Sequence, residues 1–121
     1  MKLLPQELEV WYLIPAIRRE LTKFFIKKHE LTQKQVAEIL GLTESAVSQY
    51  LKGKRAEELK FNASEVKIIE KYADKIIKDK KSVGKHLFSL SIKLRGTSSL
   101  CELHKEQDSS VNKNCKICME K

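Results

Sequence analysis

Residues 31–55 read LTQKQVAEILGLTESAVSQYLKGKR, and this stretch decides the fold class. Thr32 is followed three residues later by Gln35, which is the spacing of a capping box, so a helix is predicted to begin at Gln33. Gly41 comes directly after the last apolar residue of that helix, where a glycine in a left-handed conformation ends a helix at little cost. The stretch therefore opens with one short helix.

A second short helix is predicted directly after it. Thr43 is placed to cap its start, and Glu44 beside it interacts favourably with the positive end of the helix dipole. Val47 and Tyr50 are spaced to face inward, and Gly53 ends the helix. Two short helices joined by about three residues that include a glycine form a helix-turn-helix unit.

This stretch resembles the lambda-repressor-like (XRE-type) family of DNA-binding domains, and the similarity extends over residues 14–77. The resemblance rests on Gln33, Ala37, Gly41 and Val47 and on the KGKR end. It implies an all-α, lambda-repressor-like helix-turn-helix bundle of five helices that places the first residues of its second motif helix in the major groove. Carried onto this chain, the base-facing residues are Glu44, Ser45, Ala46 and Gln49, while Gln33 touches a phosphate and supports them.

The chemistry of these side chains agrees with that implication. Gln49 can bond adenine through two hydrogen bonds, Ser45 can bond several bases, and Ala46 can meet a thymine methyl. Glu44 has two interpretations, because it could accept a hydrogen bond from cytosine or only cap its helix. After the helix, Lys52, Lys54 and Arg55 stand where phosphates would pass.

The composition limits the architecture. The 121 residues suit one compact domain, or a small domain with an extension, and the 2 prolines and 4 glycines favour a helix-rich chain. The formal charge of +8 is concentrated in the middle of the chain, which fits either a polyanionic partner or a solvated lysine-rich surface. We predict a DNA-binding domain over residues 1–80, an additional helix over 81–100 and a metal-binding tail over 101–121.

The segments that flank the motif also have helical patterns. Pro15 suits the first turn of a helix, and QELEVWYLI before it is either a separate helix or an extended arm. Within that first helix, Arg19 falls on the polar side of the pattern. Further on, Asn62 or Ser64 caps a helix and Ser82 caps another.

Dimerisation is expected, because one small domain makes few contacts and two-fold dimers on inverted half-sites solve that problem. The sequence offers two candidate surfaces. One is the amino-terminal segment with Trp11 and Tyr12, and the other is the VGKHLFSLSIKL helix, where Phe88 and Ile92 lie off the main apolar stripe. Core packing explains either segment equally well.

The carboxy-terminal tail has the spacing of a metal site. Cys101 and His104 form one pair, and Cys115 and Cys118 form a second pair after ten residues. Zinc accepts a tetrahedral set of three cysteines and one histidine, and a [2Fe–2S] cluster also takes four such ligands, so both cofactors stay open. A disulfide would leave one thiol over and is rare in the cytoplasm. Four protein ligands leave no open position, so we do not expect an enzyme.

The whole arrangement is similar to a group of predicted archaeal regulators that join this DNA-binding domain to a CxxH/CxxC cysteine cluster. The prediction is a dimeric, sequence-specific transcriptional regulator that binds double-stranded DNA, with a tail metal that orders the carboxy terminus or senses redox or iron status. The alternative is an adaptor that links transcription machinery through the helix-turn-helix surface. No run approaches the roughly 18 apolar residues of a membrane span, so a cytoplasmic location is expected.

Overall fold

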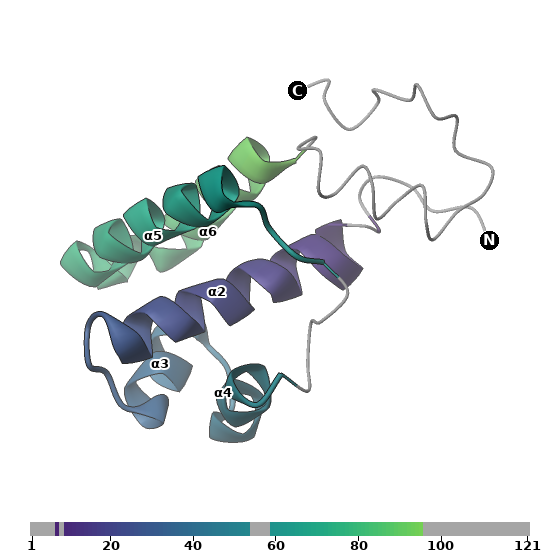
Figure 1. Ribbon diagram of the computed structural model, residues 1–121. Coiled ribbons are helices and arrows are strands. Elements are labelled where there is room, and N and C mark those ends of the chain that lie inside the picture. Colours follow the sequence, from purple (N-terminus) through teal and green to yellow (C-terminus); the bar gives the residue numbers. More distant parts are fainter. Residues whose placement is uncertain (1–6, 8, 54–58, 96–121) are drawn as a thin grey trace, which may run out of the picture.

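The computed structural model describes residues 7, 9–53 and 59–95, and all regular structure in these parts of the chain is helical (Figure 1). The elements are η1 (Glu9–Leu13), α2 (Ile14–Lys27), α3 (Gln33–Leu40), α4 (Glu44–Leu51), α5 (Ala63–Lys78), η2 (Lys80–Ser82) and α6 (Val83–Leu94). The all-α prediction is therefore confirmed for the residues that the structure describes. None of the described helices is long and apolar enough to cross a membrane.

Helix α2 lies in the middle of the bundle (Figure 1). Helices α3 and α4 pack against each other and against one side of α2. Helix α5 packs against the other side of α2, and α6 packs against α5 and η1. The two helices of the predicted motif thus share one layer, and α2 separates them from α5 and α6.

The start of α2 resolves the alternatives for the segment before it. Residues Glu9–Leu13 form a single π-helical turn, and Leu13 itself has helical angles of φ −69° and ψ −53°. The chain therefore continues from η1 into α2 without an extended arm. Pro15 lies in the first turn of α2, as predicted.

One face of α2 carries the apolar residues that the sequence pattern predicts, with Ile17, Leu21 and Phe25 all buried. Arg19 is a correction, because only 7% of it is exposed. Its Nη1 donates a hydrogen bond of 2.8 Å to the carbonyl of Leu59, and its guanidinium lies 5.9 Å from the centre of the Phe61 ring. Helical periodicity could not predict this burial, since the covering residue comes forty positions later.

Helix α5 begins with a second capping box. Asn62 Oδ1 accepts a hydrogen bond of 2.9 Å from the Glu65 N–H, and Glu65 Oε1 accepts one of 2.8 Å from the Asn62 N–H. This selects Asn62 over Ser64 as the cap. Ser82 precedes α6 as predicted, although its side chain makes no capping hydrogen bond.

A single apolar core joins the described helices. Its members come from η1, α2, α3, α4, α5 and α6, and they include Leu13, Leu21, Val36, Val47, Ile69 and Leu90. Leu90 and Leu94 of α6 are fully buried in it. Helix α6 therefore helps to hold the layer that presents α3 and α4, while the proposed division of roles at residue 80 stays a prediction.

Candidate nucleic-acid interface

The start of α3 is fixed by the predicted capping box. Thr32 Oγ1 accepts a hydrogen bond of 3.1 Å from the Gln35 N–H, and Gln35 Oε1 accepts one of 2.8 Å from the Thr32 N–H. These two bonds satisfy backbone groups that a helix end otherwise leaves without partners. Gln33 is the first residue of α3 and is exposed, so its side chain is available to a ligand.

The turn between the two helices also has the predicted geometry. Gly41 adopts φ 66° and ψ 36°, which is the left-handed conformation that favours glycine. The Leu42 N–H donates to the carbonyl of Ala37 at 2.9 Å, and the Leu42 side chain packs against the core. The turn is therefore short and closed, and it sets the angle between α3 and α4.

Helix α4 is capped at both ends. Thr43 Oγ1 accepts a hydrogen bond of 3.1 Å from the Ala46 N–H, as predicted for an N-cap. At the other end, the Lys52 N–H donates to Ser48 at 3.0 Å and Gly53 adopts φ 71°. Gly53 therefore ends the helix as the sequence predicted.

The sides of α4 divide into a buried face and an accessible one. Val47 and Tyr50 are buried at 0% and 3% exposure, which confirms their predicted inward orientation. Glu44 and Ser45 are exposed at the first turn, and Gln49 is half-buried one turn later. The accessible face thus carries three of the four residues that the sequence placed opposite the bases.

Ala46 differs from those three. Only 5% of it is exposed, so the expectation that its methyl is presented to a thymine is not met in this structure. The reason is its position next to Val47 on the inner edge of a two-turn helix. Resemblance to a family assigns a residue to a position, whereas the crossing of α3 and α4 decides how much of that residue remains uncovered.

The comparison with protein families agrees with this geometry. Residues 23–57 match the family model described as Helix-turn-helix. The match makes this segment similar to helix-turn-helix domains. The matched range runs from the last turns of α2 through α3 and α4. No curated protein and no solved structure matched the chain.

Of the three basic residues predicted to contact phosphates after α4, only Lys52 lies among the described residues. Lys52 is exposed at the end of α4. Lys54 and Arg55 lie outside the described residues, so their predicted role stays a prediction. The predicted metal ligands of the tail also lie outside the described residues, namely Cys101, His104, Cys115 and Cys118.

Within the described part of the chain, no group of histidine, cysteine and acidic side chains could hold a metal ion. The two described histidines contact single carboxylates instead. His29 Nε2 lies 2.9 Å from Asp74 Oδ1, and His86 Nε2 lies 3.5 Å from Asp79 Oδ2.

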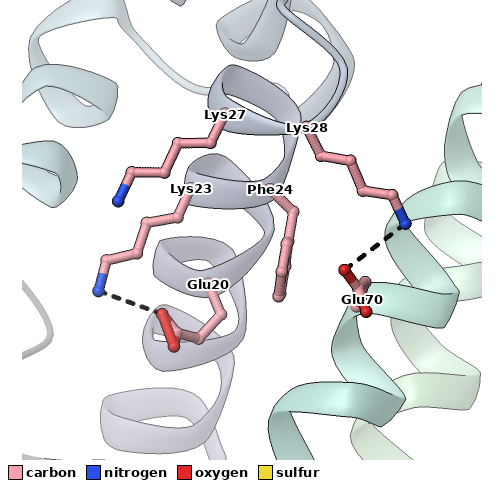
Figure 2. A pocket seen from close by; sticks show the side chains of 6 residues that line it. All are labelled: Glu20, Lys23, Phe24, Lys27, Lys28 and Glu70. Carbon is pink, nitrogen blue, oxygen red and sulfur yellow. Dashed lines mark ion pairs between the residues drawn. The ribbon is translucent and has the colours of Figure 1, made fainter.

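A surface hollow of about 520 Å³ lies between α2 and α5 (Figure 2). Phe24 lines it together with charged residues of both signs. Lys23 Nζ lies 3.3 Å from Glu20 Oε2, and Lys28 Nζ lies 3.5 Å from Glu70 Oε2. Because these lysines are already paired with carboxylates, the hollow offers little net charge to an anion.

The pKa of the Asp74 carboxylate is lowered. Lys28 Nζ donates a hydrogen bond of 3.1 Å to Asp74 Oδ2, and this bond lowers the pKa of Asp74 below its usual value of 3.8. The same hydrogen bond raises the pKa of Lys28 above 10.5. Neither residue was singled out from the sequence, because their contact joins positions 46 residues apart.

Helix α5 also carries a regular series of lysines that was not predicted from the sequence. Lys67, Lys71, Lys75 and Lys78 are all exposed. Their spacing was available in the sequence, since residues four apart lie above one another on a helix. Apolar periodicity predicts only the buried face of a helix, and the lysines lie on the opposite face.

Proposed function

We propose that this protein is a sequence-specific DNA-binding transcription regulator that inserts α4 into the major groove. The observation that carries the proposal is the accessible face of a doubly capped α4, where Glu44, Ser45 and Gln49 remain uncovered. The family match over residues 23–57 supports it. A cytoplasmic location goes with that function, and we propose no catalytic role.

The expected reading chemistry follows from the side chains on that face. Gln49 offers an amide that can donate to and accept from adenine, and the Ser45 hydroxyl can bond several bases. Glu44 is exposed in the first turn of α4, which fits both of its interpretations, as a base acceptor and as a dipole-stabilising residue. Ala46 takes part only if DNA binding uncovers its methyl.

Phosphate contacts would hold α4 in register. Gln33 is exposed at the start of α3, and Lys52 is exposed at the end of α4. In the sequence, Gln33 comes before the accessible face of α4 and Lys52 comes after it. Lys54 and Arg55 are the next basic residues after Lys52. Each neutralised phosphate adds about 0.9 to the slope of log affinity against log salt.

The regulator is proposed to act as a homodimer. Val10 and Trp11 of η1 are 60% and 50% exposed, and Phe88 of α6 is 66% exposed. Large apolar side chains in such positions support both of the dimer surfaces named from the sequence. The tail is proposed to bind zinc or a [2Fe–2S] cluster through Cys101, His104, Cys115 and Cys118, on the strength of their spacing.

An electrophoretic shift with pooled genomic fragments, followed by sequencing of the bound fraction, tests the DNA proposal. We expect a defined set of enriched sequences, and we expect Gln49→Ala to relax the preference at one base pair at a cost of about 1–3 kcal/mol. Lys52→Gln should weaken binding to all sequences and make the salt slope shallower by about one. Lys27→Gln removes an exposed charge from the last residue of α2, outside the predicted contact residues, and serves as the matched control.

The adaptor alternative makes the opposite prediction. Enrichment of no sequence, together with binding that changes little with salt, would reject DNA reading and favour a protein partner. The metal proposal is tested separately by elemental analysis and by the absorbance of freshly purified protein. A [2Fe–2S] cluster gives a brown protein and zinc a colourless one, and absence of both metals would reject the site.

A further inference from the structure

The outer face of α5 carries a line of positive charge that the reading of DNA by α4 does not use. Four exposed residues, which we call the lysine stripe, follow one another at spacings of four, four and three residues: Lys67, Lys71, Lys75 and Lys78. Residues at these spacings fall on the same face of a helix. The stripe is therefore continuous along α5, and Lys80 and Lys81 of η2 come after it beyond Asp79.

The stripe points away from the helix-turn-helix. The buried apolar residues of α5 are Ile69, Tyr72, Ala73 and Ile76, and they lie on the opposite face of the helix. That buried face packs against α2, and α3 and α4 lie on the far side of α2 (Figure 1). A duplex held by α4 would therefore leave the stripe uncovered.

The described ion pairs and hydrogen bonds of the acidic residues of α5 are with residues outside the stripe. Glu65 is buried in its capping box, and Glu70 and Asp74 both contact Lys28 of α2. Among the described residues, Lys67 and Lys71 form no ion pair. Residues 63–95 contain nine basic and four acidic side chains, so this part of the chain has a net charge of +5.

Helix stability does not account for such a line of lysines. Like charges four residues apart destabilise a helix, whereas a solvated surface usually mixes both signs. Lys75 is the member with a structural contact, since its Nζ lies 4.6 Å from the centre of the Tyr72 ring. Lys75 and Lys78 also lie in the last turn of α5, where positive charge favours the helix dipole, whereas Lys67 and Lys71 have no such role among the described residues, which points to a ligand.

The chemistry of the stripe selects the kind of ligand. Protein interfaces are enriched in aromatic residues and arginine and depleted in lysine, and the stripe consists of lysine alone. Lysine binds phosphate as a point charge with no demand on sequence. The stripe runs for about 16 Å along the helix axis, and duplex DNA presents a phosphate about every 1.7 Å of its own axis.

We propose that the lysine stripe is a second, sequence-independent binding surface for the phosphate backbone of duplex DNA. One chain then holds two duplex segments, one at α4 and one at α5, on opposite sides of α2. The second contact has no base readout, so its affinity depends on salt and not on sequence. The proposal that one chain holds two duplexes depends on the DNA binding by α4 proposed above. The positive charge of the stripe does not depend on that proposal.

A capture experiment with the full chain tests this surface. One duplex is fixed to beads, the protein is bound to it, and a labelled duplex of unrelated sequence is added. We expect capture of the second duplex by the unmodified protein and a loss of about tenfold or more in the variant Lys67→Gln/Lys71→Gln, because two phosphate contacts are removed. Lys27→Gln/Lys60→Gln removes the same charge from exposed positions outside the stripe, and it should capture normally.

Each other outcome overturns the proposal. If capture persists in the stripe variant, the second duplex is held by the second α4 helix of a dimer. If the control variant loses capture to the same extent, the overall charge of the chain is responsible. Binding to anionic vesicles that requires Lys67 and Lys71, without capture of a second duplex, would assign the stripe to a membrane surface. Thermal unfolding of both variants checks the fold, and the stripe variant should not melt lower because it relieves like-charge repulsion.

The two proposals fail in different ways. Absence of a sequence preference in the unmodified chain rejects reading by α4. An unchanged sequence preference with no second-duplex capture rejects only the stripe.

Discussion

His29 Nε2 lies 2.9 Å from Asp74 Oδ1, so the segment that follows α2 is tied to the middle of α5. Lys28 binds the other oxygen of the same carboxylate at 3.1 Å. Directly after these contacts the chain turns through Glu30, whose φ of 55° is unusual for a residue with a side chain. One carboxylate thus holds the approach to α3, and with it the position of the helix-turn-helix on the bundle.

Asp74→Asn should lower the free energy of unfolding by about 0.5 kcal/mol near neutral pH, a small value because the ion pair is partly exposed and screened by solvent. The folded-state pKa of Asp74 lies below 3.8, so its contribution is present above that pH and is lost as the pH falls through the folded value. The difference between the two proteins should therefore shrink below about pH 4. Thermal melts over a pH series measure it.

The matched control is Glu38→Gln, which changes an exposed carboxylate that has no ion pair with a described residue. It should leave stability nearly unchanged over the same pH series. A difference for Asp74→Asn that grows as the pH falls would contradict the role assigned to this carboxylate.

Thr43→Ala should destabilise the chain by about 1 kcal/mol, because the Ala46 N–H loses its acceptor at the start of α4. Thr43→Ser keeps an oxygen in the same place and should restore most of that loss. Urea unfolding followed by circular dichroism gives both values. Equal stability of the alanine and serine variants would show that the cap does not hold α4.

Gly41→Ala should cost about 1–2 kcal/mol, because the left-handed φ of 66° is unfavourable for any residue with a Cβ. An added Cβ at this position meets nothing within 4 Å, so the cost is conformational and not steric. Gly84 also has open space around its Cβ position, but it lies within α6. Gly84→Ala should accordingly stabilise the protein by about 0.5 kcal/mol, and the opposite signs can be read from one denaturation series.

Leu94→Ala should destabilise the fold by about 2–5 kcal/mol, because a fully buried side chain of the common core is removed. Phe88→Ala lies two turns earlier on α6 but removes a side chain that is 66% exposed, so it should change monomer stability by less than about 0.5 kcal/mol. If Phe88 contributes to a dimer, its variant shifts the oligomeric state in sedimentation experiments while its fold persists. A small effect of Leu94→Ala would mean that α6 is dispensable to the core.

The parts of the fold that were predictable from sequence are those with local causes. Thr32, Gly41, Thr43 and Gly53 each act on backbone groups within a few residues, so a short pattern was enough to place the helix ends. The family resemblance predicted which residues of α4 face the bases; Ser45 is exposed and Ala46 is buried, and contact with bases stays a prediction.

The parts that were not predictable depend on contacts between distant residues. Arg19 is buried because Leu59 and Phe61 cover it, and Asp74 becomes important because α2 brings Lys28 to it. The π-helical turn at Glu9–Leu13 has no sequence signature of the kind that marks a capping box. The predicted metal ligands lie outside the described residues, and spacing alone supports them.

The capped ends of α3 and α4 affect the thermodynamics of binding at the accessible face of α4. Thr32, Gly41 and Thr43 already fix these helices in the free chain, so little conformational entropy remains to be lost on association. Calorimetry of a complex at α4 should then show a heat-capacity change that matches the buried surface, without the larger signal of coupled folding. Differences in affinity between ligands would reflect the ligands themselves, including how easily each one deforms.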